Sequence, residues 1–236
     1  MNKNVFTYWQ GKKPDLIMEL ESRMKYVCEQ NGYTLWDLDN KCIRDYINIP
    51  KEFSKPNHIM NITSFIRIEL LIKYGGIWVD KDTLAINEFD NLFDKIESND
   101  GFVVGIPILN RIGFNNAIIG SSPNSEFYVK WSEHNHKVLT QDKKTWGKVP
   151  FGVSYLKKCY RESLFYKMSI VNGVENRMEY FADFKNNKLL SDTDVSIILN
   201  CNPSLVHFFS RNIRPYYKMN QEQRQKTLLY KLLKNT

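Results

Sequence analysis

The stretch from Asn61 to Ile86 constrains the fold of this chain more than any other. Asn61 is a suitable N-cap, the residues after it favour a helix, and Gly75 stands where helices end in a left-handed residue. A helix is therefore expected from about Ile62 to Tyr74. The glycine turn is followed by Ile77–Val79, an apolar run typical of a short buried strand.

Arg67 is out of place in that helix. Apolar residues spread around most of the helix circumference, which indicates that the helix is buried. A buried guanidinium needs an acidic partner, which is either a protein carboxylate or a ligand phosphate. The sequence leaves both options open.

Asp80 and Asp82 follow the predicted strand with one lysine between them. In extended backbone, side chains two positions apart point the same way, so both carboxylates should project together and Lys81 should face away. Paired carboxylates at the carboxyl end of a strand can hold Mg²⁺ or Mn²⁺, which suits a diphosphate. A bare Asp-x-Asp is more often a solvated turn, so the surrounding sequence decides.

Three segments together resemble the DXD sugar-transferase and capsular-polysaccharide-synthesis glycosyltransferases. The middle segment is the most specific: a helix with an internal Arg, then Tyr-Gly-Gly-Ile-Trp-Val-Asp-x-Asp from Tyr74 to Asp82. Val5 to Gly11 is similar to the family's opening strand and Trp-x-Gly turn, and Asn202 to Phe209 is similar to its late strand with a metal-binding His. The resemblance implies a GT-A-type, Rossmann-like α/β fold with a mostly parallel central sheet and a C-terminal helix.

The same resemblance implies which residues form the site. Asp80, Asp82 and His207 would bind Mn²⁺ or Mg²⁺, and Asp80, Asp82 and Arg67 would act in catalysis. The nucleotide sugar would be bound by residues from several stretches of the chain: Tyr8, Trp9, Gly11, Thr63, Ser64, Arg67, Trp78, Asp80, Asn116, Ser210 and Arg211. Ser64 departs from the family pattern, because relatives carry there an aspartate that helps to hold the donor.

The rest of the chain alternates strand and helix signals, as in a parallel sheet. Residues 1–212 are expected to form the nucleotide-sugar transferase domain, and residues 213–236 a basic helical appendage. The leucine stripe of that appendage fits a helix docked on the protein better than an interfacial one. Strands are expected at Val5–Trp9, Tyr33–Leu38, Gly101–Pro107, Asn115–Gly120, Ser169–Val171 and Val195–Leu199, and helices after Pro14, after Ser122 and from Asn220 onward.

The net charge of +7 admits nucleic acid, an anionic membrane or a phosphorylated substrate as a partner. A nucleic-acid-binding protein is not favoured, because the excess charge gathers after Arg211 and the aromatic residues lie in apolar runs. The four cysteines are too far apart for a zinc knuckle. The polar N-terminus and the absence of a long apolar run predict a cytoplasmic protein, with peripheral contact at the inner face of a membrane as an option.

These features predict a hexosyltransferase-type glycosyltransferase of polysaccharide biosynthesis. The expected donor is a nucleoside diphosphate sugar, with a UDP-sugar favoured over a GDP-sugar, and the acceptor is a glycan, a lipid-linked saccharide or another hydroxyl. The resemblance implies metal dependence and retention of the anomeric configuration. The alternative is a catalytically inactive nucleotide-sugar-binding relative or a scaffold protein, which Ser64 favours. A phosphohydrolase would need further carboxylates close in sequence.

Overall fold

The computed structural model describes residues 2–54, 59–108, 111–140, 151–161, 168–172, 178–180, 190–192, 194–208 and 213–236. The chain divides into two compact units. Unit 1 comprises Met1–Lys13, Gly32–Val79 and Asp90–Asn172, and unit 2 comprises Pro14–Asn31, Asp80–Phe89 and Gly173–Thr236.

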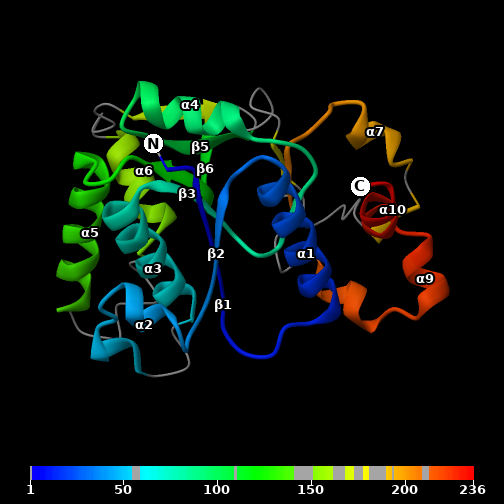
Figure 1. The fold of residues 1–236 in the computed structure, drawn as a ribbon, viewed down its shortest axis with the longest axis horizontal. Coiled ribbons are helices and arrows are strands. Elements are labelled where there is room, and N and C mark those ends of the chain that lie inside the picture. The colour runs from blue at the N-terminus through cyan, green and yellow to red at the C-terminus, as the bar shows by residue number, and fades with distance from the viewer. Residues whose placement is uncertain are drawn as a thin grey trace. The chain divides into compact units, whose positions relative to one another are not determined.

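Unit 1 is built on a six-stranded sheet with the order β2-β1-β3-β6-β5-β7. Its strands are β1 (Asn4–Trp9), β2 (Thr34–Asp39), β3 (Gly76–Val79), β5 (Gly101–Ile108), β6 (Arg111–Ser121) and β7 (Ser169–Asn172). Figure 1 labels five of these strands, β1, β2, β3, β5 and β6. β1 lies parallel to β2 and β3, and β5 lies parallel to β7, whereas β6 runs antiparallel to both β3 and β5. The expected mixed α/β fold with a mostly parallel sheet is confirmed.

The helix α3 (Ile59–Tyr74) is the central helix of unit 1, as its apolar circumference predicted. It begins three residues before the expected Ile62, so Asn61 lies inside the helix and is not its N-cap. It contacts α5 and the strands β1, β3 and β6. Phe65, Ile66, Ile68 and Leu70 on it are almost completely buried. In the part of unit 1 that the structure describes, the helices are α2 (Ile43–Tyr46), a 3₁₀ helix (Lys51–Ser54), α3 (Ile59–Tyr74), α4 (Asp90–Ser98), α5 (Glu126–Leu139) and α6 (Val153–Arg161).

The turn between α3 and β3 requires glycine at two consecutive positions. Gly75 has φ +63° and Gly76 has φ +120°, values that L side chains rarely adopt. A Cβ on Gly75 would collide with Pro123, and a Cβ on Gly76 would collide with the backbone of Asn4. This close approach sets β3 beside β1, and every residue of β3 is buried. The end of β3 at Val79 therefore fixes where the Asp-x-Asp segment begins.

Unit 2 contains a three-stranded sheet with the order β4-β9-β8. β4 (Thr83–Ala85) runs antiparallel to β9 (Leu205–His207), and β8 (Met178–Tyr180) runs parallel to β9. The helix α1 (Asp15–Gln30) packs against β4. Among the described residues of unit 2, the other helices are α7 (Ser196–Leu199), the 3₁₀ helix Arg214–Lys218, α9 (Gln221–Gln225) and α10 (Leu228–Asn235).

Two expectations for the C-terminal part are wrong. Val195–Leu199, expected to be a strand, contains the helix α7, because a short apolar run fits a strand and a helical turn alike. The helix expected from Asn220 is interrupted. α9 ends at Gln225, and the Thr227 hydroxyl caps α10 by accepting a hydrogen bond from the Tyr230 amide.

The leucine stripe of α10 is buried within the protein. Leu228, Leu229 and Leu232 are at most 1% exposed, which confirms a docked helix. In the part of the chain that the structure describes, none of the helices combines the length and the apolar composition needed to cross a membrane. Residues on both sides of the expected domain boundary at 212 belong to unit 2, and that boundary stays a prediction.

Candidate functional site

The Asp-x-Asp segment forms a turn between β3 and β4. β3 ends at Val79 and β4 begins at Thr83, so neither aspartate belongs to a strand. The expected mechanism, alternation along extended backbone, is therefore wrong. The turn itself brings the carboxylates together, and ligand atoms of Asp80, Asp82 and His207 lie within 4.8 Å of one another.

His207 reaches this turn because β9 pairs with β4. The strand register places His207 opposite Thr83, and Thr83 Oγ1 lies 3.0 Å from Nδ1 of His207. Asp82 Oδ1 lies 3.5 Å from the same nitrogen. The backbone carbonyl of Asp82 accepts a hydrogen bond from the Phe208 amide at 2.9 Å. Main chain and side chain together hold Asp82 against the end of β9.

The residues of this cluster fit a divalent metal ion. Asp82 is 6% exposed and His207 is 2% exposed, whereas Asp80 is half-buried and faces solvent in part. Two carboxylates and an imidazole supply three donor atoms at close range, and a buried carboxylate needs such a cation or hydrogen bonds nearby. The contact with Thr83 orients the imidazole ring, as hydrogen-bond partners of metal-binding histidines do.

Tyr217 is a neighbour of the cluster that the sequence did not indicate. It lies in the 3₁₀ helix Arg214–Lys218 and is half-buried. Burial raises the pKa of its phenol above the ordinary value, and the negative charge of Asp82 raises that pKa further. The phenol therefore remains a neutral hydrogen-bond donor. A tyrosine ten residues after a histidine is too common a pattern to have singled it out.

Arg67 is buried in unit 1, where backbone carbonyls and an aromatic ring surround it. Its Nε donates to the Thr63 carbonyl at 3.3 Å, and its Nη1 donates to the Asn116 carbonyl. The guanidinium lies 5.0 Å from the centroid of the Trp78 ring, which is itself fully buried. Arg67 thus contacts three of the residues expected at the nucleotide-sugar site, Thr63, Asn116 and Trp78.

Ser64 and Asn116 approach each other at Gly152. A Cβ on Gly152 would lie 3.2 Å from Oγ of Ser64 and would collide with the side-chain amide of Asn116. Glycine at this position therefore lets two polar side chains come close to the backbone. The sequence offered only a Phe-Gly pair after a proline as a signal for this residue.

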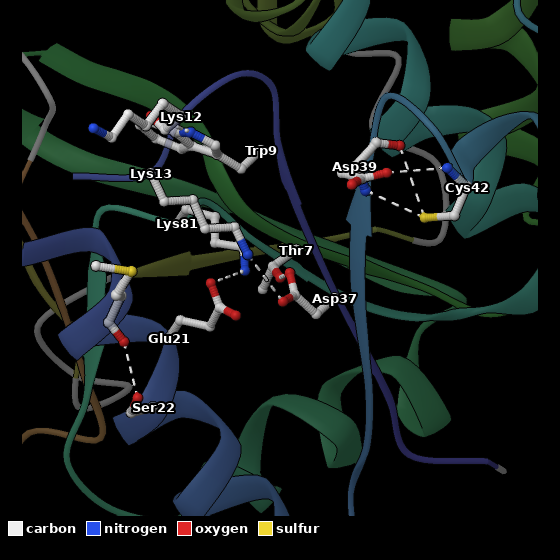
Figure 2. A network of polar contacts seen from close by, with 11 residues as sticks. Thr7, Trp9, Lys12, Lys13, Glu21, Ser22, Asp37, Asp39, Cys42 and Lys81 are labelled. Carbon is white, nitrogen blue, oxygen red and sulfur yellow. Dashed lines mark hydrogen bonds and ion pairs between the residues drawn. The ribbon is translucent and has the colours of Figure 1, made fainter. Parts of the chain in front are cut away.

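The residues expected to contact the nucleoside lie at the end of β1. Tyr8 is buried, its hydroxyl donates to Oε1 of Gln10 at 3.4 Å, and burial is the main reason why its pKa is raised to about 12. The indole of Trp9 donates to the Lys12 carbonyl at 3.4 Å (Figure 2). Gly11 is exposed, with φ +93°.

Asp37 is a further polar residue at this end of the sheet. The parallel register of β1 and β2 places it opposite Thr7, whose hydroxyl donates to Asp37 at 3.4 Å. Nζ of Lys13 lies 3.2 Å from the other oxygen of the same carboxylate (Figure 2). The charge of Lys13 is therefore balanced within unit 1.

The sequence-predicted site residues fall into two groups. The metal cluster of Asp80, Asp82 and His207 belongs to unit 2. Ser210 and Arg211 lie outside the described residues. The remaining predicted residues belong to unit 1, and they are Tyr8, Trp9, Gly11, Thr63, Ser64, Arg67, Trp78 and Asn116.

Solved structures share this fold at low sequence identity. The glycosyltransferase involved in the glycosylation of the major capsid of PBCV-1 aligns with a TM-score of 0.53 and 11% identity, over 92% of this chain and 98% of that one. The glycosyltransferase GlyE of Streptococcus pneumoniae TIGR4 aligns with a TM-score of 0.50 and 13% identity, over 99% of this chain and 63% of that one. The fold is thus that of the GT-A glycosyltransferases.

Sequence comparison defines the family. None of the curated proteins matches the chain. The model of the capsular polysaccharide synthesis protein family matches residues 1–231, which is nearly the whole sequence. The Asp-x-Asp turn, the late histidine and the GT-A fold agree with that match, and the chain belongs to the capsular polysaccharide synthesis protein family.

Proposed function

We propose that this protein is a metal-dependent glycosyltransferase of the hexosyltransferase type. It transfers a sugar from a nucleoside diphosphate sugar to a hydroxyl of a glycan or a lipid-linked saccharide, with retention of the anomeric configuration. The observation that carries the proposal is the cluster of Asp80, Asp82 and His207 in a chain of this family and fold.

The cluster has the donor atoms that this reaction needs. Asp80, Asp82 and His207 would hold a divalent ion, which would supply positive charge to stabilise the departing diphosphate. Asp82 and His207 would hold the ion as buried ligands, and Thr83 keeps the His207 ring in place. Asp80 is more exposed, which suits a residue that also binds a ribose or sugar hydroxyl. Mn²⁺ is favoured over Mg²⁺, because His207 contributes a nitrogen and Mg²⁺ prefers oxygen ligands.

The polar residues of unit 1 are assigned to the donor. The side chains of Ser64 and Asn116 both approach Gly152. Arg67 donates a hydrogen bond to the Asn116 carbonyl, so its role in the donor site is to position Asn116. Trp9 and Gly11 are assigned to the nucleoside, following the resemblance to the family. A UDP-sugar is favoured over a GDP-sugar as the donor. No protein nucleophile is assigned.

A catalytically inactive relative is the second candidate, and Ser64 is the observation that favours it. Ser64 stands where family members carry a donor-binding aspartate, and a hydroxyl cannot supply the charge of a carboxylate. Such a protein would bind a nucleotide sugar without transferring the sugar. Membrane contact through Leu228, Leu229 and Leu232 of α10 is not part of either candidate, since those side chains are buried.

The release of nucleoside diphosphate from a panel of UDP- and GDP-hexoses tests the proposal. The purified protein is expected to hydrolyse at least one UDP-hexose slowly with Mn²⁺ and not with EDTA. Adding saccharide acceptors should raise the rate. An inactive relative would instead bind the donor in calorimetry with Mn²⁺ and release no nucleoside diphosphate from any member of the panel.

A further inference from the structure

Lys81, the residue between the two aspartates of the cluster, is one of the most buried charged residues in the described chain. Its side chain is 3% exposed, and its Nζ lies 3.0 Å from Oε2 of Glu21 on α1 (Figure 2). The side chain of Glu21 is 26% exposed. A buried ammonium is unfavourable without a partner, so this ion pair ties the middle of the turn to α1.

Arg23 makes a second connection between α1 and the same segment. Its Nε donates to the Ala85 carbonyl at 3.2 Å, and its Nη2 donates to the Ile86 carbonyl at 3.0 Å. Glu21 therefore holds the chain before β4, and Arg23 holds it where β4 ends. The helix and the strand also pack against each other between these points.

β9 holds the segment by separate contacts. The Phe208 amide donates to the Asp82 carbonyl at 2.9 Å, and the Ile86 amide donates to the Ser204 carbonyl at 2.8 Å. These contacts fix Asp82 but do not touch Lys81. The ion pair with Glu21 acts directly on the residue whose backbone separates the two carboxylates.

We propose that the Glu21–Lys81 ion pair positions the metal cluster. By fixing Lys81, the pair keeps the turn in the shape that brings Asp80 and Asp82 within ligand distance of His207. Without the pair, the turn relaxes and the divalent ion binds more weakly. This inference rests on the metal site of the proposed function. Glu21 and Lys81 are positioning residues in it, and neither contacts substrate.

The competing explanation is that Glu21 only neutralises a buried lysine. A double variant, Glu21→Gln with Lys81→Met, separates the two explanations. It removes the pair without leaving a buried charge, so its melting temperature should lie near that of the wild type. It also leaves the net charge near the cluster unchanged, which excludes a simple electrostatic effect on cation binding.

Direct titration with Mn²⁺ alone, followed by the electron paramagnetic resonance signal of the free ion, is the measurement. Glu21→Gln is compared with Glu19→Gln, which removes the same charge from the same helix. Glu19 pairs with Lys234 at 3.5 Å, and both side chains are exposed. Glu21→Gln and the double variant should both bind Mn²⁺ about tenfold more weakly or worse. Glu19→Gln should change the affinity by about twofold or less.

Four outcomes would overturn the inference. Wild-type Mn²⁺ affinity in the double variant would show that the pair only neutralises Lys81, even if Glu21→Gln alone fails to fold. Equal weakening by Glu19→Gln would show a general effect of charge. If the wild type and Asp82→Asn both fail to bind Mn²⁺, the metal-dependent function fails together with the inference. If the wild type binds Mn²⁺ and both Glu21→Gln and the double variant bind it equally well, the inference fails but the metal-dependent function stands.

Discussion

Asp82 is held in the cluster by both its main chain and its side chain. It is buried, its carboxylate faces the His207 imidazole, and its carbonyl is bound by the Phe208 amide. Asp80 is half-buried at the start of the turn. The two aspartates of one short motif therefore have different environments, and this difference leads to different expectations for their variants.

Asp82→Asn should abolish Mn²⁺-dependent transfer, with a loss of roughly a hundredfold or more, because an amide keeps the shape but loses the charge that binds the ion. Asp80→Asn should lower turnover about tenfold and keep a response to Mn²⁺. Rates of sugar transfer or donor hydrolysis against Mn²⁺ concentration measure both. Circular dichroism confirms that each variant is folded. Wild-type turnover and metal dependence in Asp82→Asn would contradict the site assignment.

Arg67→Lys should lower the free energy of unfolding by about 1.5–3 kcal/mol. The reason is that a lysine ammonium cannot reproduce the planar guanidinium, which donates hydrogen bonds to two backbone carbonyls. Arg44→Lys is the matched control, since Arg44 is exposed and donates to the Ile49 carbonyl at 3.5 Å. That change should stay within about 0.5 kcal/mol. Denaturant unfolding of both variants provides the comparison. Equal losses would show that the Arg67 contacts contribute little to stability.

The contacts of Arg67 also show a limit of residue patterns. Its burial followed from the apolar residues around it, and that expectation is confirmed. The sequence suggested a carboxylate or a phosphate as its partner, and the structure adds contacts that no pattern indicated, with the carbonyls of Thr63 and Asn116 and the ring of Trp78. Backbone carbonyls are present at every residue, so only the path of the chain decides which of them a guanidinium can reach.

At the scale of elements, the α3–β3 unit was predictable because its signals are local. The glycine turn and the buried strand appear where the sequence indicated, and the helix ends at Tyr74 as expected. The start of the helix was not predicted correctly, because α3 begins at Ile59 and Asn61 lies inside it. The apolar run Val195–Leu199 became the helix α7 because four or five apolar residues carry no period that distinguishes a strand from a helical turn.

Gly75→Ala should destabilise the protein by about 2–4 kcal/mol, the sum of left-handed backbone strain and a collision with Pro123. Gly32→Ala is the control: Gly32 follows α1 with φ +68°, but a Cβ there would meet open space. Its expected cost is about 1 kcal/mol. Unfolding in urea measures both variants. Similar losses would mean that strain alone, and not the packing of the turn, makes glycine necessary at Gly75.

At the scale of the whole molecule, the proposed function predicts that nucleotide and metal stabilise the protein together. UDP at a hundred times its dissociation constant should add about 2.7 kcal/mol to the free energy of unfolding when Mn²⁺ is present. UDP with EDTA should add much less, because the cluster cannot engage the diphosphate without an ion. Thermal shift assays with UDP, Mn²⁺ and EDTA in all combinations test this. Equal stabilisation by UDP in EDTA would contradict a metal bridge.

By itself, the sequence determined the elements whose signals lie within a few residues of one another: the first strand, helix and strand, the α3–β3 unit and the paired aspartates. Only the tertiary structure decided the contacts between distant segments. The pairing of β4 with β9 brings His207 to Asp82, and the packing of α1 on β4 brings Glu21 to Lys81. Strand register and helix packing depend on the whole set of apolar surfaces buried at once, so a local pattern cannot specify them.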